Sequence, residues 1–531
     1  MKQGIVIIAA LALSVSAKAQ SFDDGVKMYN YERYQSAEKI FTPLAANNAM
    51  ANYYMGLSQL ERGDVNTAKL TFAKYPEDPA NMAGMARVAF TQGNITQGMQ
   101  LATAVAGKAR KKEWEPLKYA ADAITYSDAD GLNYQQAIDW YKKALENTDN
   151  ADLRISLGDA YQKTLGGGGE AMNNYEKVTN KDPKNSLAYT RAGYLWYAAK
   201  NYQLALESLD KAKAADPNNP LPYRYLAYAY EGAGKYDLAY ENIQKYMPLS
   251  DNSVDDQIRY TEILFLSKHY AEVVTKANGL ISSGVHKPGI YGILAFSQYE
   301  TKDSVNALKN IRTYFATQEP RKLLSKDYQY YAQILMQNGM GDSASYYFNR
   351  AVTSDSTQNK SDIYRDIANN FKDTKNYAKS AEWYDKLIKA YPETQPVDYF
   401  WRGAMYFYAK DYSNAAKAFE EMETKFPNEQ SATYWRGRVG AAIDNEGKEG
   451  TAVPFFTKWL EKVGPNYEKK KDLQLAYDYL ALYYYNKDDK ENLKKYEDLI
   501  IAIDPADDLV KQLKDAEKQA ASSKKPAPKK K

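Results

Sequence analysis

The amino-acid sequence predicts an all-α solenoid, a stack of similar helical hairpins. Small residues recur about every 34 positions, and most are followed twelve positions later by Ala and four after that by a large apolar residue. A fixed period of this length is typical of repeat proteins, in which each unit packs only against its neighbours. The clearest of these small residues are Gly158, Gly193, Ala227, Ala295, Ala332, Ala368, Gly403 and Gly437.

One unit shows the whole pattern, through Tyr399, Gly403, Tyr406, Ala415, Phe419, Met422 and Pro427. This pattern resembles the tetratricopeptide repeat (TPR) family, and the resemblance covers nearly all of the chain after its first nineteen residues. It implies a TPR superhelix in which each unit is two antiparallel helices, with the small residue of the first helix against the Ala of the second. A proline then follows the second helix, because proline cannot continue it.

About fourteen units can be placed along the chain. The third, with Ala86 and Gly98, and the eighth, with Thr261 and Val273, are degenerate, and the thirteenth needs a longer turn over residues 445–450. In chain order, the first helices of the units carry Gly25, Gly56, Ala86, Tyr119, Gly158, Gly193, Ala227, Thr261, Ala295, Ala332, Ala368, Gly403, Gly437 and Ala481.

The two ends of the chain differ from the repeats. Residues 1–19 combine Lys2, an apolar run and the sequence Ala17-Lys18-Ala19, which predicts a cleaved signal peptide, with an uncleaved anchor as the alternative. Residues 20–505 form the predicted repeat array and 506–521 a helix that caps its last unit. Residues 522–531 contain only Ser, Lys, Pro and Ala, which predicts a disordered tail.

The composition indicates in which compartment the protein acts and which class of partner it binds. The chain has no cysteine, which excludes a disulfide framework and a lipoprotein anchor. With the signal peptide, this predicts a periplasmic protein of a Gram-negative bacterium, or else a secreted one, without a transmembrane segment in the mature chain. The net charge is +3, but Lys2 and Lys18 lie in the leader and five lysines in the tail, so the repeats carry about −4. A nucleic-acid partner is therefore not expected.

The sequence gives little support to an enzyme. Its two histidines, His269 and His286, lie in a turn and in a linker, without a second histidine at metal-binding spacing. The motifs of zinc peptidases and of serine hydrolases are absent. We therefore expect neither catalysis nor a cofactor nor a metal; a hydrolase that uses one of these histidines is a weaker alternative.

The resemblance also indicates where a partner would bind. In TPR proteins the first helices line a concave groove, through residues three before the small residue and one and four after it. Tyrosine is abundant, with 49 residues, and aromatic and Arg side chains are common binding anchors. Packing against the neighbouring helix is the alternative for each of these residues. The predicted groove residues are Tyr194, Tyr197, Arg224, Tyr228, Arg365, Asn369, Phe400, Trp401 and Phe407, with Trp401 and also Trp435 lying beside the stripe.

We therefore expect a non-catalytic scaffold that binds protein segments in this groove. Compartment and resemblance suggest envelope assembly, transport or secretion. Arg365 and Asn369 resemble the start of the carboxylate clamp of some TPR domains, but Trp401, Ser431 and Trp435 replace its other members, so chaperone tails are not expected. The alternative function is a glycan-binding accessory protein that uses surface aromatics. The lysine tail either keeps the protein soluble or contacts an anionic envelope surface.

Overall fold

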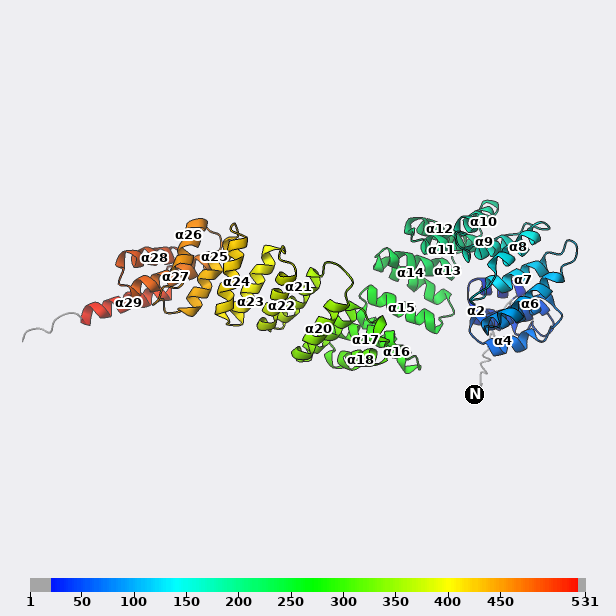
Figure 1. Ribbon diagram of the computed structural model, residues 1–531, viewed down its shortest axis with the longest axis horizontal. Coiled ribbons are helices and arrows are strands. Elements are labelled where there is room, and N and C mark those ends of the chain that lie inside the picture. Colours follow the sequence, from blue (N-terminus) through cyan, green and yellow to red (C-terminus); the bar gives the residue numbers. More distant parts are fainter. Residues whose placement is uncertain (1–20, 524–531) are drawn as a thin grey trace, which may run out of the picture. The chain divides into compact units, whose positions relative to one another are not determined.

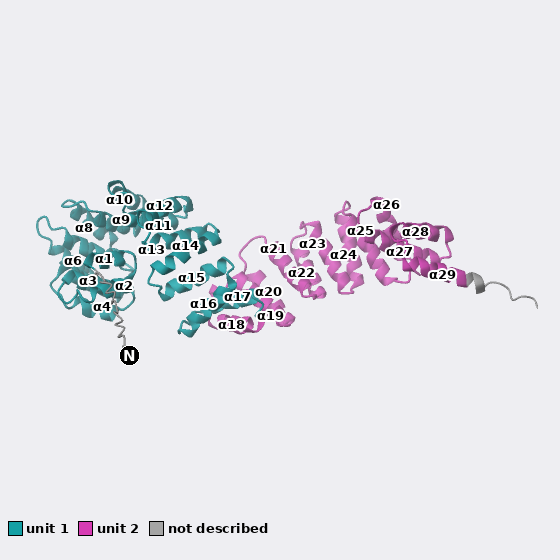
Figure 2. Ribbon diagram, turned by 180° about the vertical axis from the view of Figure 1, so that it is seen from behind, with its two compact units in different colours: residues 1–303 teal, residues 304–531 magenta. Residues whose placement is uncertain are grey.

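The computed structural model describes residues 21–523, and all regular structure in this range is helical (Figure 1). The chain divides into two compact units, residues 1–303 and 304–531 (Figure 2). The predicted signal peptide and most of the predicted lysine tail lie outside the described residues. No helix in the described range is long and apolar enough to cross a membrane.

Unit 1 contains the first seventeen helices. They are α1 (Phe22–Asn30), α2 (Tyr34–Phe41), α3 (Ala49–Glu61), α4 (Val65–Phe72), α5 (Pro79–Thr91), α6 (Ile95–Gly107), α7 (Glu115–Thr125), α8 (Tyr134–Leu145), α9 (Ala151–Gln162), α10 (Gly168–Lys181), α11 (Ser186–Ala198), α12 (Tyr202–Ala215), α13 (Pro220–Gly232), α14 (Tyr236–Leu249), α15 (Val254–Leu266), α16 (Tyr270–Ser282) and α17 (Pro288–Glu300).

Unit 2 contains the remaining helices and one short 3-10 turn, η1 (Pro320–Lys322). They are α18 (Ser304–Thr317), α19 (Ser325–Gln337), α20 (Gly341–Ser354), α21 (Ser361–Asp373), α22 (Tyr377–Ala390), α23 (Pro396–Tyr408), α24 (Tyr412–Lys425), α25 (Gln430–Ile443), α26 (Val453–Val463), α27 (Lys470–Asn486), α28 (Lys490–Ile503) and α29 (Asp508–Ser523).

The all-α repeat fold is confirmed. Taken two at a time, α1–α28 give the fourteen predicted units, and α29 follows them where the sequence predicts a capping helix over 506–521. Val510 and Leu513 of α29 are buried, and α29 packs against α27 and α28. Each of the five predicted stop prolines stands two residues beyond the end of a second helix: Pro183, Pro217, Pro392, Pro427 and Pro505.

Glycine at the recurring position makes room for the large residue of the second helix. A Cβ on Gly56 would lie 2.4 Å from the Phe72 ring, and one on Gly403 would lie 2.7 Å from the Phe419 ring. Non-bonded carbon atoms prefer a separation of about 3.5–4 Å, so any side chain at these positions would push the two helices apart. The 34-residue pattern in the sequence therefore arises from this contact between the two helices of each unit.

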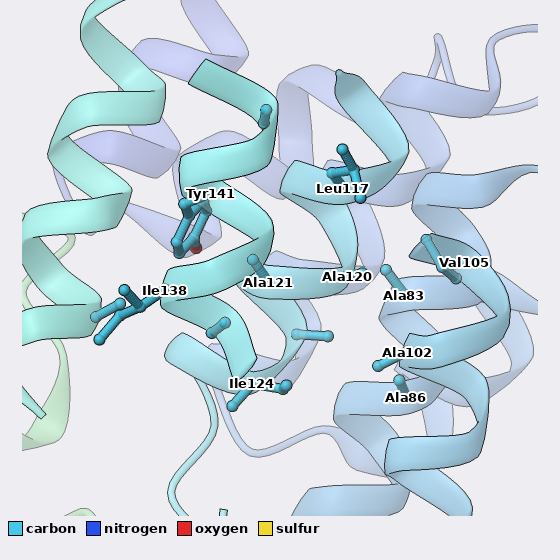
Figure 3. Packing of buried hydrophobic residues seen from close by; sticks show 14 of the residues in the cluster. Ala83, Ala86, Ala102, Val105, Leu117, Ala120, Ala121, Ile124, Ile138 and Tyr141 are labelled. Atoms are coloured by element: carbon cyan, nitrogen blue, oxygen red, sulfur yellow. The ribbon is translucent and has the colours of Figure 1, made fainter. Parts of the chain in front are cut away.

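The third unit departs from the pattern because its aromatic residue lies on the first helix and its glycine on the second. Phe90 lies on the first helix, α5, and a Cβ on Gly98 of the second helix would lie 2.3 Å from that ring. Ala86, at the expected position, is fully buried. In Figure 3, Ala86 and its neighbour Ala83 lie beside the small residues of α6 within the same apolar core. The degenerate sequence thus still builds a closely packed hairpin.

The turn between the two helices of a unit is short and has a left-handed residue at its centre. Eleven units have a three-residue turn, and the middle residue has positive φ in each of them. Gly or Lys occupies nine of these positions, and the other two hold Glu32, in the first unit, and Asp488, in the last. Glu32 pairs with distant helices of unit 1.

Candidate functional site

The first hairpin of unit 1 contacts helices that lie nearly 200 residues further along the chain. The Tyr31 hydroxyl donates a hydrogen bond to Asp216, and the Lys27 ammonium lies 2.9 Å from the same carboxylate. On the other side of the turn, the Ser36 backbone N–H donates to Asp251 at 3.0 Å, and Arg33 pairs with Asp251 at 3.5 Å. These contacts close the repeats of unit 1 on themselves.

Glu32 is the central residue of this closure. Its carboxylate accepts a hydrogen bond from the Arg224 guanidinium at 2.5 Å, and the Arg191 guanidinium lies 3.9 Å away. Burial alone would raise the pKa of Glu32, but the charges of Arg224 and Arg191 lower it more, so this pKa lies below its usual value. Arg224, predicted as a groove anchor, is thus held in an ion pair within unit 1.

The closure borders a partly open cavity of about 290 Å³ in unit 1. First helices of successive units line it, and its most frequent side chain is tyrosine: Tyr29, Tyr34, Tyr53, Tyr54, Tyr119 and Tyr126. Several of these rings pack together, with centroids 5.5 Å apart for Tyr29 and Tyr34 and 5.4 Å apart for Tyr29 and Tyr54. This tyrosine-lined interior was not predicted from the sequence.

Charged side chains of the cavity wall are already paired. Arg87 pairs with Glu61 at 2.7 Å and Lys118 with Asp122 at 2.6 Å. Asp159 receives hydrogen bonds from the Tyr126 and Tyr175 hydroxyls and lies 3.3 Å from the Arg191 Nε. The wall therefore presents few free ions to a bound molecule.

The predicted tyrosines of unit 1 form a separate cluster on α11 and α13. The ring of Tyr194 lies 4.9 Å from that of Tyr225, and the rings of Tyr197 and Tyr228 are 6.3 Å apart. The Arg259 guanidinium stacks 4.7 Å from the Tyr228 ring and pairs with Glu231. The structure thus brings Tyr194, Tyr197 and Tyr228 together; their role in binding stays a prediction.

In unit 2, Arg365 and Asn369 bond to neighbouring helices. Arg365 donates two hydrogen bonds to the buried Asp398, at 2.8 and 3.0 Å. The Asn369 amide oxygen accepts from the Tyr384 hydroxyl at 3.0 Å and from the Lys372 ammonium at 2.8 Å. These bonds join α21 to α22 and α23, so both residues contribute to packing.

Phe400 and Phe407 lie in an aromatic cluster around Trp435. Their ring centroids are 5.5 and 5.3 Å from that of Trp435, which itself is buried against Phe419. Trp401 lies beside Phe400, with 5.4 Å between centroids, and the Lys372 ammonium lies 4.2 Å from the Trp401 ring. A cavity of about 730 Å³ opens next to this cluster, between α23, α25 and the segment before α27.

Arg438 lines this cavity and was not predicted from the sequence as a groove residue. Its guanidinium lies 4.0 Å from the Trp435 centroid and 5.1 Å from that of Phe407, and it has no hydrogen bond or ion pair to any described residue. Arg438 is one residue after Gly437, where the spacing of the family places a groove residue. The spacing of the family could therefore have identified Arg438 as a groove residue.

Both histidines have local partners. The His269 Nδ1 lies 3.0 Å from the Ser267 hydroxyl, and its ring stacks on Tyr240 with 4.1 Å between centroids. The His286 Nδ1 lies 2.8 Å from the Tyr291 hydroxyl. Within residues 21–523, no group of His, Cys, Asp or Glu is arranged to hold a metal ion.

Comparison with known proteins gives the family. A sequence profile of the tetratricopeptide repeat matches residues 156–220. The C-terminal part of a TPR repeat-containing protein from Cytophaga hutchinsonii is 32% identical, with 48% of this chain and 98% of that one covered and a TM-score of 0.38. A TPR protein from Parabacteroides merdae is 18% identical, with 46% and 94% covered and a TM-score of 0.33. No curated protein matches the chain.

The chain belongs to the tetratricopeptide repeat family. A repeat profile of this family matches residues 156–220, and the helical hairpins before and after this segment keep the same spacing. This membership supports a protein-interaction scaffold.

Proposed function

We propose that the protein is a non-catalytic scaffold that binds a partner protein through the aromatic cavity of unit 2. The observation that carries the proposal is Arg438, a cation without an ionic partner in the described range, stacked on Trp435 and Phe407 at the edge of a cavity of about 730 Å³. Trp, Tyr and Arg side chains at such a surface supply most of the binding free energy of protein interfaces.

The chemistry of this cavity favours one kind of partner segment. The stacked guanidinium is held in place but keeps its N–H donors free, so it can bind a carboxylate through two parallel hydrogen bonds. The apolar faces of Phe400 and Val397 line the same cavity. We therefore expect a segment in which an Asp, a Glu or a C-terminal carboxylate is next to an apolar side chain.

Crosslinking in cells, followed by mass spectrometry, tests this proposal. The tagged protein should capture a reproducible partner, and the crosslinked segments should contain a carboxylate beside an apolar residue. Arg438→Ala should lower the yield of this partner at least tenfold, because it removes a charge-assisted, bidentate contact. Arg321→Ala is the matched control, since Arg321 is also in unit 2 but is 82% exposed outside the cavity. Equal capture by the Arg438 variant would contradict the proposal.

We also propose that the protein acts in the periplasm, in envelope assembly, transport or secretion. Lys2, the apolar run after it and Ala17-Lys18-Ala19 support export, and the absence of cysteine is compatible with an oxidising compartment. N-terminal sequencing of the protein from a periplasmic fraction should begin at Gln20. A cytoplasmic protein that still carries residues 1–19 would contradict this part of the proposal.

A further inference from the structure

We infer that the tyrosine-lined cavity of unit 1 binds a small, neutral, polyhydroxylated ligand, a mono- or disaccharide. This site is separate from the unit 2 cavity and does not depend on the function proposed above. Its volume of about 290 Å³ is close to the lower limit for small-molecule pockets, which span roughly 300 to 1,000 Å³. A ligand of one or two sugar rings is therefore the appropriate size, and an extended protein segment is too large.

The paired charges of the wall argue against an ionic ligand. The pairs Lys118–Asp122 and Arg191–Asp159 are largely buried, and a charged ligand would have to displace one partner and leave the other without compensation. Such an uncompensated buried charge is strongly destabilising. The remaining charges, Asp128, Asp152 and Lys163, are exposed, and they mark where the cavity meets solvent.

Several unused polar groups of the wall are neutral hydroxyls. The hydroxyls of Tyr34, Tyr53 and Tyr54 line the cavity and have no hydrogen-bond partner among the described residues. Burial raises the pKa of each of these three groups, so all of them stay protonated at neutral pH. A phenol hydroxyl both donates and accepts, as a sugar hydroxyl does, so the two form mutual hydrogen bonds. The polar requirement of the cavity is thus for several neutral donors and acceptors.

The tyrosine rings supply the second half of sugar recognition. The rings of Tyr34 and Tyr54 pack at an angle against the ring of Tyr29, with centroids 5.5 and 5.4 Å from it, and Tyr53 joins Tyr54 to Tyr119. They form an apolar wall on which the C–H face of a sugar ring can pack while its hydroxyls reach the phenol oxygens.

Calorimetric titration of the full-length protein tests the inference. The probes are glucose, galactose, N-acetylglucosamine, maltose and cellobiose, each at up to about 10 mM, which detects millimolar affinity. At least one should bind in a saturable way. Tyr34→Phe and Tyr54→Phe keep the rings and remove only the hydroxyls, so each should weaken binding about tenfold.

Two control variants test whether the sugar binds in this cavity. Tyr346→Phe is the matched variant, because Tyr346 is exposed in unit 2, and it should leave binding unchanged. Arg438→Ala should also leave it unchanged, which distinguishes the sugar site from the protein-binding cavity. The inference is overturned if none of the five sugars binds, if the two phenylalanine variants bind as well as the parent, or if free glutamate or lysine binds the cavity instead.

Discussion

Replacing Glu32 by Gln should release the first hairpin of unit 1. The substitution keeps the size of the side chain but removes the charge that Arg224 and Arg191 share. Exposed ion pairs contribute about 0–1 kcal/mol, and breaking a fully buried pair costs about 3–5 kcal/mol. The Glu32 and Arg224 side chains are 25% and 16% exposed, which places the pair between these limits, at about 2 kcal/mol.

Amide hydrogen exchange measures this opening directly. In a repeat array the end units can open without global unfolding, so exchange reports the local free energy better than a global transition does. A loss of about 2 kcal/mol corresponds to exchange about 30-fold faster. We expect this acceleration in α1 and α2, and none in unit 2. Equal exchange rates in the parent and the variant would refute the role of Glu32 in closure.

The last hairpin offers a matched control. Asp488 is also acidic and also occupies the left-handed centre of a three-residue turn, but its side chain makes no hydrogen bond or ion pair in the described range. Asp488→Asn should therefore leave exchange in α27 and α28 unchanged. The effect of Glu32 also depends on pH. Because its pKa is lowered in the folded protein, its contribution is complete above the unfolded pKa, about 4.3, and is lost as pH falls below it.

Three further predictions concern stability. Gly403→Ala should lower the free energy of unfolding by about 1–3 kcal/mol, and with it the unfolding temperature, because the new Cβ would meet the Phe419 ring. Gly279→Ala should raise the unfolding temperature slightly, because Gly279 lies in α16 with open space around it. Asp444→Asn should lower the free energy of unfolding by about 2 kcal/mol at pH 7. Burial opposes ionisation of Asp444, but hydrogen bonds from the Tyr479 hydroxyl and from backbone N–H groups lower its pKa to about 2. The free energies of unfolding of parent and variant, measured by urea titration, should therefore converge as pH falls from about 4 to 2. Burial and the nearby Asp507 raise the pKa of Asp478 to about 7, so this residue destabilises the folded protein as pH rises between about 4 and 7. Asp478→Asn should therefore raise the melting temperature at pH 8 and not at pH 4. The same gain at both pH values would contradict the raised pKa.

The repeat pattern predicted the fold well because it reports a contact that every unit makes. Gly56 against Phe72 and Gly403 against Phe419 are sixteen residues apart, so the spacing is visible in the sequence. The number of units and the helix after the last one follow from the same rule. Even the third unit obeyed it in a modified form, because Gly98 accommodates Phe90 instead.

The closure of unit 1 could not be predicted in the same way. Glu32 and Arg224 are 192 residues apart, and their meeting depends on the accumulated rotation of the intervening repeats. A small change of rotation per repeat would move the two residues apart, and no local pattern records that rotation. One signal was present, namely an acidic residue at a turn position that usually holds Gly or Lys.

The groove residues of unit 2 show a different limit. The spacing of the family identified Phe400 and Phe407 beside the cavity, but it also gave Arg365, which Asp398 already binds. Position alone does not reveal whether an Arg has a partner, because the partner comes from the next repeat. Arg438 and Arg365 both stand at groove positions of their helices, and among the described residues only Arg438 lacks such a carboxylate.

Closure of unit 1 would separate the two proposed kinds of binding within one repeat protein. A TPR groove can hold an extended segment only while its first helices face open solvent. In unit 1 the bonds of Glu32, Tyr31 and Ser36 join the first hairpin to later repeats and leave an interior of about 290 Å³, room for a small molecule only. The unit 2 cavity of about 730 Å³ has a free cation and aromatic faces. If Glu32→Gln opens the first hairpin, sugar binding should weaken while partner capture through Arg438 stays unchanged, because the two sites use different residues of different units.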